Sequence, residues 1–215
     1  MYAIPTEKDY TEVKRLIDIL VEHGFGSWDR GYTYFNWLDD WNDVLANHYG
    51  FTFYEGCTKV VAVNEDYHKW VIKINLCTDK GPHDESYCGE EALNWIAAIN
   101  VGLESYFAAT YFVEVVNGIE FFMQEYAEGN EEIYDSRCYA YYNSNVLSLG
   151  EESSGYYEDY WEMDDSERLT AIYGDDSDTH DLINFCWDTR INDLHCGNFG
   201  ETTDGRTVIF DYSGY

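Results

Sequence analysis

The spacing of apolar residues predicts several amphipathic helices in this chain. Between Thr6 and Gly24 they recur every three or four positions, which is typical of one helical face. Thr6, with Asp9 three residues later, predicts the N-cap of this helix. The same spacing predicts a short helix over 34–46 and a third over 90–103. The apolar positions of the third helix are Ala92, Leu93, Ile96, Ile99 and Leu103.

Runs of β-branched and aromatic residues predict strands between these helices. A strand over 58–63 and a second over 69–74 are separated by the polar turn 64–66. Further on, Asn117-Gly118 separates two such runs, 111–116 and 119–123. Asn-Gly provides the two positive-φ residues of a type I′ turn, so this segment predicts a hairpin.

The second half of the chain is more acidic and less regular. From Glu151 to Asp181 there are twelve acidic residues and one basic residue, Arg168. We expect loops and helix ends in this block, followed by a helix through Leu182 and Cys186. Asp204-Gly205 then predicts a final hairpin between 199–201 and 208–210.

These elements together predict an α+β fold. A chain of 215 residues can bury one good core, which two lobes can share. Hydrophobic residues make up 45% of the sequence and aromatic residues 18%, which argues against disorder despite the charge.

The net charge of −30, from 12 basic and 42 acidic residues, narrows the choice of partners. Direct binding to nucleic acid is disfavoured, because that contact needs Lys and Arg to neutralise phosphates. A basic protein partner fits this charge, and so does an acidic surface that only keeps the protein in solution.

The sequence also predicts the compartment. The first residues contain no apolar segment of the kind found in a secretory signal, and no run is long enough to span a membrane. The six cysteines are scattered and form no Cys-x-x-Cys pair. We therefore expect reduced thiols in a cytoplasm, which would be the host cytoplasm if the compact, acidic chain is viral.

Three oxygen-bearing residues near the end of the sequence suggest chemistry. Asp193 is followed by Asn198, and after the predicted hairpin by Asp211. The hairpin would place Asn198 and Asp211 at one end of adjacent strands, where an amide and a carboxylate oxygen can bind Mg²⁺. Asp193 could orient or accept the proton of an attacking hydroxyl group.

This arrangement resembles the protein-kinase-like fold, as does the order hairpin, helix, hairpin, helix, catalytic-type loop and hairpin. The resemblance covers roughly 50–215. It implies an N-terminal helical extension over 1–49 and an N-lobe over 50–126, with an antiparallel sheet and one key helix. A reduced helical C-lobe over 127–215 would follow.

The resemblance also implies roles for individual residues. Val71-Ile72-Lys73-Ile74 is similar to the strand motif whose Lys contacts the ATP phosphates, and Glu91 is similar to its partner, with Glu90 as the competing choice. Asp193, Asn198 and Asp211 correspond to the catalytic Asp and the two Mg²⁺ ligands. The residues implied to line the nucleotide are Gly56, Lys73, Glu125 and Tyr126.

The sequence departs from the family pattern in several places. Ile191-Asn192 replaces the usual His-Arg, so we expect no control by a phosphorylated activation loop. A single glycine, Gly56, stands where the family has two or three. Because the printed sequence stops at Tyr215, we expect the activation segment and the peptide-docking helices to be missing.

Three hypotheses for function follow. The first is an ATP- and Mg²⁺-dependent phosphotransferase acting on an unknown hydroxyl acceptor. The second is a catalytically weak or inactive kinase-like protein whose acidic surface binds and inhibits a basic, nucleic-acid-binding protein by imitating nucleic acid. The third is a structural domain in which the motifs occur by chance.

Two other chemistries are less consistent with the sequence. His180, Cys186, His195 and Cys196 contain ligand types for zinc, but their spacing fits no usual ligand pair. Cys196 as a nucleophile with His195 as its base is disfavoured, because adjacent side chains seldom face each other. We expect His195 to form a local hydrogen bond that shapes its loop.

Overall fold

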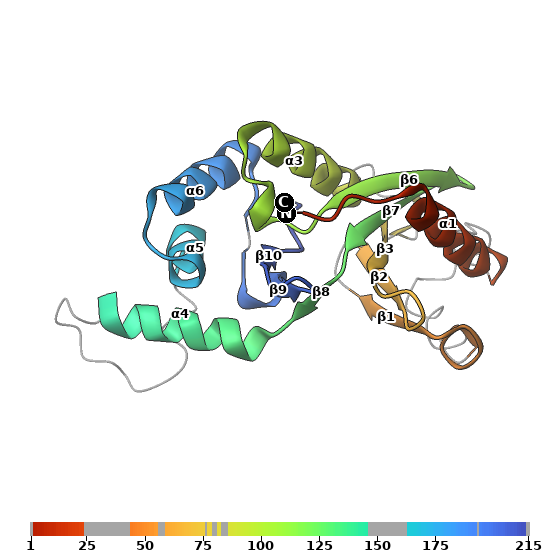
Figure 1. Ribbon diagram of the computed structural model, residues 1–215, viewed down its shortest axis with the longest axis horizontal. Coiled ribbons are helices and arrows are strands. Elements are labelled where there is room, and N and C mark those ends of the chain that lie inside the picture. Colours follow the sequence, from red (N-terminus) through yellow and green to blue (C-terminus); the bar gives the residue numbers. More distant parts are fainter. Residues whose placement is uncertain are drawn as a thin grey trace. The chain divides into compact units, whose positions relative to one another are not determined.

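The computed structural model describes residues 2–23, 44–55, 59–75, 77–78, 81–82, 86–145, 163–192 and 194–213. The fold is mixed α+β, as predicted (Figure 1). The chain divides into two compact units. Unit 1 comprises Met1–Ala97 and Ala108–Tyr126, so the segment expected as a separate N-terminal extension belongs to it. Unit 2 comprises Ala98–Phe107 and Ala127–Tyr215.

Unit 1 is built on a five-stranded antiparallel sheet in the order β1-β2-β3-β7-β6. Its strands are β1 (Phe51–Glu55), β2 (Lys59–Asn64), β3 (Trp70–Asn75), β6 (Thr110–Val116) and β7 (Ile119–Glu125). A small two-stranded sheet pairs β4 (Cys77–Thr78) with β5 (Gly81–Pro82). The helices are α1 (Glu7–Glu22), a short helix over 44–49, and α3 (Tyr87–Val101), which continues into unit 2.

The two faces of this sheet differ in polarity. Because side chains alternate along a strand, the registers place one set of apolar residues together on one face. These buried residues are Val60, Ala62, Trp70, Ile72, Ile74, Phe121 and Met123. The opposite face carries a row of buried polar residues, described below with the candidate site.

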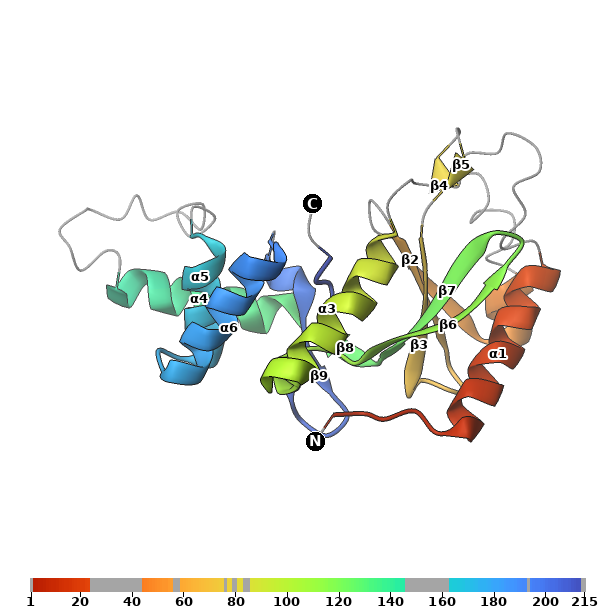
Figure 2. The same cartoon turned by 90° about the horizontal axis from the view of Figure 1, so that it is seen from above.

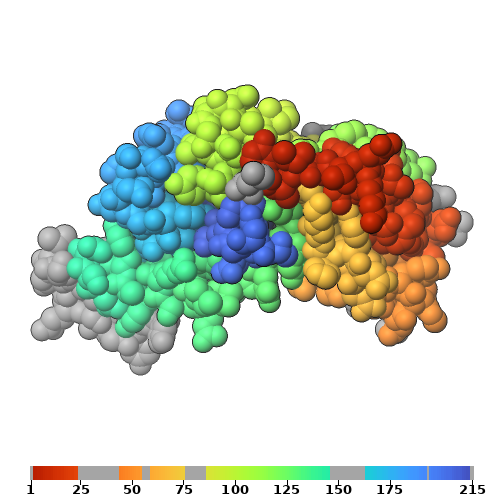
Figure 3. Space-filling model, in the orientation of Figure 1, coloured from red at the N-terminus to blue at the C-terminus, as the bar shows by residue number. Residues whose placement is uncertain are grey.

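Helix α1 begins as predicted. Thr6 is its N-cap, and the two residues form a capping box: the Thr6 hydroxyl oxygen accepts from the Asp9 N–H at 3.2 Å, and the Asp9 carboxylate accepts from the Thr6 N–H at 2.7 Å. The helix buries Val13, Leu16, Ile17 and Leu20 and contacts β3 and β6 of the sheet (Figures 1 and 3). The predicted helix over 34–46 lies mostly outside the described residues, which are helical from 44 to 49.

Asp9 also joins α1 to the turn before β3. Its buried carboxylate accepts hydrogen bonds from the Tyr67 hydroxyl and from Lys69 Nζ, the latter at 2.8 Å. Burial raises the pKa of this carboxyl group, but the hydrogen bonds from Lys69, Tyr67 and Thr6 outweigh it and hold the pKa well below its usual range.

We therefore predict that Asp9→Asn lowers the free energy of unfolding at pH 7 by about 1–3 kcal/mol. Since the folded-state pKa is depressed, this stabilisation is present above the unfolded value of about 3.9 and is lost as the pH falls below it. Urea denaturation between pH 3 and 7 measures both effects. Asp18→Asn, at an exposed position of the same helix, is the control; an equal loss in both variants would contradict the prediction.

The hairpin between β6 and β7 has the predicted turn. Asn117 and Gly118 have φ of 53° and 83°, and Val116 pairs with Ile119. The β2 and β3 predictions are also confirmed to within one residue at each end.

Helix α3 covers most of the predicted segment, but two of its five listed apolar positions do not face the core. Leu93 and Ile96 are 67% and 54% exposed. The buried stripe consists instead of Cys88, Glu91, Trp95 and Ala98, again at helical spacing. One carboxylate therefore lies within the buried face of this helix.

Unit 2 combines helices (Figure 2) with a three-stranded antiparallel sheet in the order β10-β9-β8 (Figure 1). The helices are η1 (Glu104–Tyr106), α4 (Glu131–Asn145), α5 (Asp165–Tyr173), α6 (Ser177–Thr189) and η4 (Cys196–Asn198). The strands are β8 (Ala127–Gly129), β9 (Phe199–Thr202) and β10 (Thr207–Ile209).

The core of unit 2 is aromatic. The ring of Phe107 lies 5.6 Å from that of Phe185 and 5.0 Å from that of Tyr212, measured between centroids. Tyr173 packs edge-on against Tyr106 and Phe199. Burial of these rings provides much of the apolar contact in this unit.

Two parts of unit 2 were not foreseen in the sequence. Neither α4 nor α5 was predicted, whereas α6 and the β9–β10 hairpin were. Residues 151–162 of the acidic block lie outside the described residues. Among the helices that are described, none combines the length and apolar character needed to cross a membrane.

Candidate functional site

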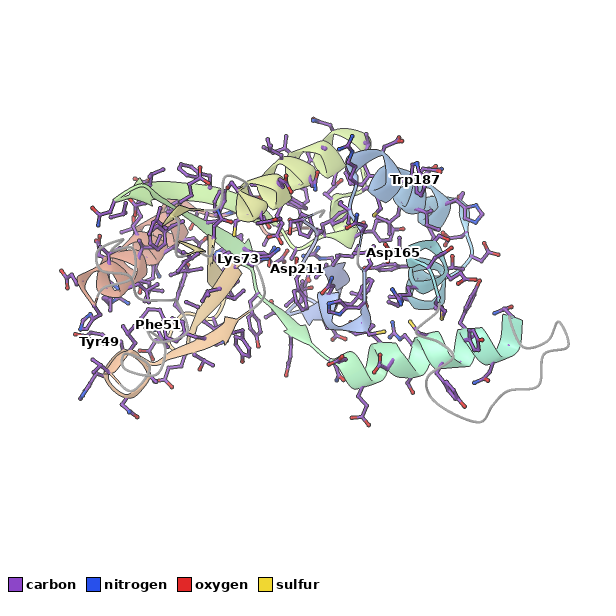
Figure 4. The ribbon with its side chains drawn as sticks, turned by 180° about the vertical axis from the view of Figure 1, so that it is seen from behind. Tyr49, Phe51, Lys73, Asp165, Trp187 and Asp211 are labelled. Carbon is purple, nitrogen blue, oxygen red and sulfur yellow. The ribbon has the colours of Figure 1, made fainter. Side chains whose placement is uncertain are left out.

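A buried ion pair forms the centre of the candidate site in unit 1. Lys73 Nζ on β3 lies 2.6 Å from Glu91 Oε2 on α3, and the two side chains are 2% and 0% exposed. Glu90, the competing choice, is exposed. Figure 4 labels Lys73 on its strand. The ion pair expected between Lys73 and Glu91 is therefore present.

A second lysine shares this carboxylate. Lys59 Nζ on β2 lies 2.6 Å from Glu91 Oε1, and its side chain is 4% exposed. Because Val61 pairs with Lys73 in the sheet, Lys59 and Lys73 are diagonal neighbours on the same face. Each oxygen of Glu91 thus contacts a different ammonium group. Lys59 was given no role in the sequence analysis. Side chains two residues apart on a strand share a face, so Lys59 lies on the same face as Val61 and Lys73.

Gln124 and Thr110 extend the polar row across the sheet. Gln124 Oε1 accepts from Lys73 Nζ at 3.4 Å, while Gln124 Nε2 donates to Thr110 Oγ1 at 2.8 Å and to Glu91 Oε2 at 3.5 Å. All of these side chains are buried. Burying ionised groups is unfavourable unless partners are close and well placed. Lys59, Lys73 and Gln124 are such partners of Glu91, and their contacts fix the position of its carboxylate.

Asn75 anchors the start of α3. Its Oδ1 accepts from the Cys88 N–H at 2.9 Å, and its Nδ2 donates to Ser86 Oγ at 3.0 Å. Ser86 Oγ in turn donates to Glu120 on β7. Two strands of the sheet therefore hold the first turn of the helix that carries Glu91.

Glu125 and Tyr126, two of the residues implied to line the nucleotide, lie at the end of β7. The Glu125 N–H donates to Ala109 O at 2.8 Å, and the Tyr126 N–H donates to Lys69 O at 3.1 Å. The Glu125 side chain is buried and accepts from the Ala109 N–H at 3.3 Å. Both backbone N–H groups already donate hydrogen bonds within unit 1. The adenine ring of a bound nucleotide would therefore have to contact other groups. Gly56 lies outside the described residues.

In unit 2, the final hairpin brings Asn198 and Asp211 together as predicted. Phe199 pairs with Ile209, and the Phe210 N–H donates to Asn198 O at 2.9 Å. Asn198 and Asp211 therefore flank the same end of the β9–β10 ladder. Asn198 is buried and Asp211 is half-buried. Figure 4 labels Asp211 at this position.

The loop before this hairpin is tied down on both sides of Asp193, which itself lies outside the described residues. The Ile191 N–H donates to Cys186 O at 2.9 Å, and the Leu194 N–H donates to Asp165 Oδ1 at 2.9 Å. Ile191 and Leu194 are both buried. The backbone at either end of this loop is therefore fixed by α5 and α6.

His195 and Cys196 have structural contacts in this loop. His195 Nδ1 accepts from the Gly197 N–H at 3.1 Å, which is the local hydrogen bond expected from the sequence. Cys196 Sγ donates to Cys138 Sγ on α4 at 3.6 Å. This hydrogen bond lowers the pKa of the Cys138 thiol and raises that of Cys196, which is opposite to what a Cys196 nucleophile would need.

The residues at the hairpin fit the chemistry of a magnesium ion. Asn198 and Asp211 offer an amide and a carboxylate oxygen, both hard ligands, and Mg²⁺ keeps several waters when so few protein ligands bind it. Within the part of the chain that the structure describes, no cluster of three His, Cys, Asp or Glu side chains could hold a metal. The suggested zinc ligands do not assemble either, since His180 Nε2 contacts Asp175 at 2.8 Å.

Comparisons with known proteins give no family for this chain. No protein-family model matches it, and a comparison with curated proteins found no match.

Proposed function

We propose that this protein is a small ATP- and Mg²⁺-dependent phosphotransferase with a kinase-like arrangement of two lobes. The observation that carries this proposal is the buried pair of Lys73 and Glu91. A fully buried carboxylate shared by lysines is unfavourable for folding alone, and such sites are often functional. The hairpin that brings Asn198 and Asp211 together supports the same function.

In this proposal the groups of unit 1 bind the nucleotide phosphates. Lys73 contacts the α- and β-phosphates, while Glu91 holds the ammonium group in place and Lys59 holds the other oxygen of that carboxylate. A fixed ammonium group stabilises negative charge without reorganising as the reaction proceeds.

The groups of unit 2 have the metal-binding and acid–base roles in this proposal. Asn198 and Asp211 would hold Mg²⁺, which neutralises charge on the transferred phosphoryl group. Asp193 would orient the acceptor hydroxyl and take its proton. The acceptor is a hydroxyl compound whose class the residues of this site leave open.

Nucleotide-dependent stabilisation tests the proposal. Ligand at a hundred times its Kd stabilises a protein by about 2.7 kcal/mol, so ATP with MgCl₂ should raise the Tm by roughly 5–10 °C. Lys73→Met should abolish most of this shift. Lys14→Met, which removes a half-exposed lysine on α1, should leave it unchanged. No shift in the wild-type protein, or an equal shift in Lys73→Met, would rule out this phosphate site.

The alternative is an acidic, catalytically inactive protein that inhibits a basic partner. The net charge of −30 favours it. Such a protein has no need for Mg²⁺-dependent nucleotide binding, so the same measurement separates the two functions.

A further inference from the structure

A hollow in unit 2 contains none of the side chains assigned to phosphotransfer, although Ile191 and Asn192, which precede Asp193, line it. It has a volume of about 840 Å³ and is lined by α5, α6 and the segment that follows α6. Leu169, Ile183 and Ile191 provide apolar lining, with Leu169 and Ile191 buried. This volume is in the range of ligand sites in proteins, which are about 300–1,000 Å³.

An unusually exposed tryptophan lies at this hollow. Trp187 on α6 is 85% exposed, although Trp70 and Trp95 in the same chain are fully buried. Figure 4 labels Trp187 on α6 and Asp165 on the neighbouring α5. Leaving an indole ring in water is unfavourable, and tryptophan is the residue most enriched at the centres of binding interfaces.

The charged groups of the lining are mainly acidic. Asp164 and Asp165 line the hollow at the start of α5, and Arg190 is the one basic residue in the lining. The Ser166 hydroxyl and the Glu167 N–H donate to Asp164 and lower the pKa of its carboxyl group, which keeps it ionised at neutral pH. A carboxylate and the face of an indole ring both attract an organic cation.

The charge beyond the hollow indicates an extended ligand rather than a small one. Asp178 and Asp181, on α6 outside the lining, are exposed as well. A small amine would meet only the charges of the lining. A segment with several basic residues would also be attracted by the acidic residues around the hollow. The net charge of −30 on the whole protein adds to this attraction.

We propose that this hollow is the docking site for a basic segment of a partner protein, which inserts a lysine or arginine side chain against Trp187 and the carboxylates of Asp164 and Asp165. The aliphatic part of that side chain packs on the apolar lining, and its cationic end contacts the acidic residues. The proposal does not rest on phosphotransfer, and its test needs no nucleotide.

The test uses a defined probe with the full chain. A fluorescent ten-residue peptide of alternating lysine and glycine, with blocked ends, is titrated with the protein in 0.15 M salt, and anisotropy gives the Kd. Trp187→Ala is expected to weaken binding about tenfold. Asp164→Asn/Asp165→Asn should weaken it similarly. Both asparagines can still accept the hydrogen bonds from Glu167 and Leu194 that these aspartates accept. The ion pair that Asp165 loses with Arg168 is long, at 3.6 Å, so the fold should persist, and circular dichroism checks this.

The matched control removes the same number of charges from exposed positions of α6 outside the lining. Asp178→Asn/Asp181→Asn should weaken peptide binding by less than threefold, because neither residue lines the hollow. An equal loss in this variant would mean that the peptide senses only diffuse charge, and the docking site would be refuted.

Two further ligands distinguish the source of the cation. A peptide with norleucine in place of lysine should not bind measurably, and equal binding by it would refute recognition of a cation. Choline should bind at least a hundredfold more weakly than the basic peptide. Binding of choline as tight as that of the peptide would make this a small-molecule site and overturn the proposal.

Discussion

Glu91→Ala is expected to lower the free energy of unfolding by about 3–5 kcal/mol. The substitution leaves the ammonium groups of Lys59 and Lys73, both buried, without the carboxylate that each contacts at 2.6 Å. It also removes an acceptor from Gln124. An uncompensated charge in a buried site is among the few causes of a loss this large.

Urea denaturation monitored by circular dichroism measures this change at pH 7. Glu90→Ala is the matched control, because it removes the same group one position earlier on the exposed side of α3. It should change the free energy by no more than about 0.5 kcal/mol. Similar values for the two variants would show that Glu91 is not buried between the lysines.

A triple variant separates stability from function. Replacing the network by apolar residues of similar volume, as Lys59→Met/Glu91→Leu/Lys73→Met, should restore most of the stability lost in Glu91→Ala. The same variant should fail to bind nucleotide. Recovery of stability without recovery of binding is the result expected if the charges are retained for phosphate binding and not for folding.

Asp211→Asn is expected to reduce Mg²⁺-dependent phosphotransfer by at least about 10²–10³-fold, with little effect on stability. The asparagine keeps the shape of the side chain but loses the charge that would hold the metal ion, and losing one such electrostatic group typically lowers kcat by this factor. Release of phosphate from ATP, or labelling of the protein itself, measures the rate over a range of MgCl₂ concentrations.

Asp204→Asn is a suitable control for this variant. Asp204 lies in the turn of the same hairpin, where its carboxylate accepts from the Thr202 hydroxyl and contacts Arg206. It carries the same charge but lies at the far end of the ladder from Asp211. Equal activity of Asp211→Asn and the wild-type protein would exclude Asp211 as a metal ligand.

The β6–β7 hairpin, the capped start of α1 and the polar end of the last hairpin could be predicted from the sequence. Each depends on residues close together in the chain, such as the Asn117-Gly118 turn or Thr6 and Asp9. Local hydrogen bonds and backbone preferences are sufficient for such elements. The same reasoning placed Asn198 and Asp211 at one end of a strand pair.

Helix α3 shows why the remainder could not be predicted. Its helical spacing was recognised, and the resemblance implied the pairing of Glu91 with Lys73, but the apolar positions read from the sequence included the exposed Leu93 and Ile96 and not the buried Trp95. A carboxylate on a helix is expected to face water unless partners far away in the sequence compensate for its burial. Those partners, Lys59 and Lys73, lie on two different strands.

The sequence by itself determined the mixed α+β class, many of the local elements, and the placement of Asn198 and Asp211 at one end of a hairpin. Only the tertiary structure decided that Lys59 joins Lys73 at Glu91, and that Trp187 remains exposed beside a hollow. The reason is physical. Turns and caps depend on neighbouring residues, whereas burial of a charge or exposure of a ring depends on how distant elements pack.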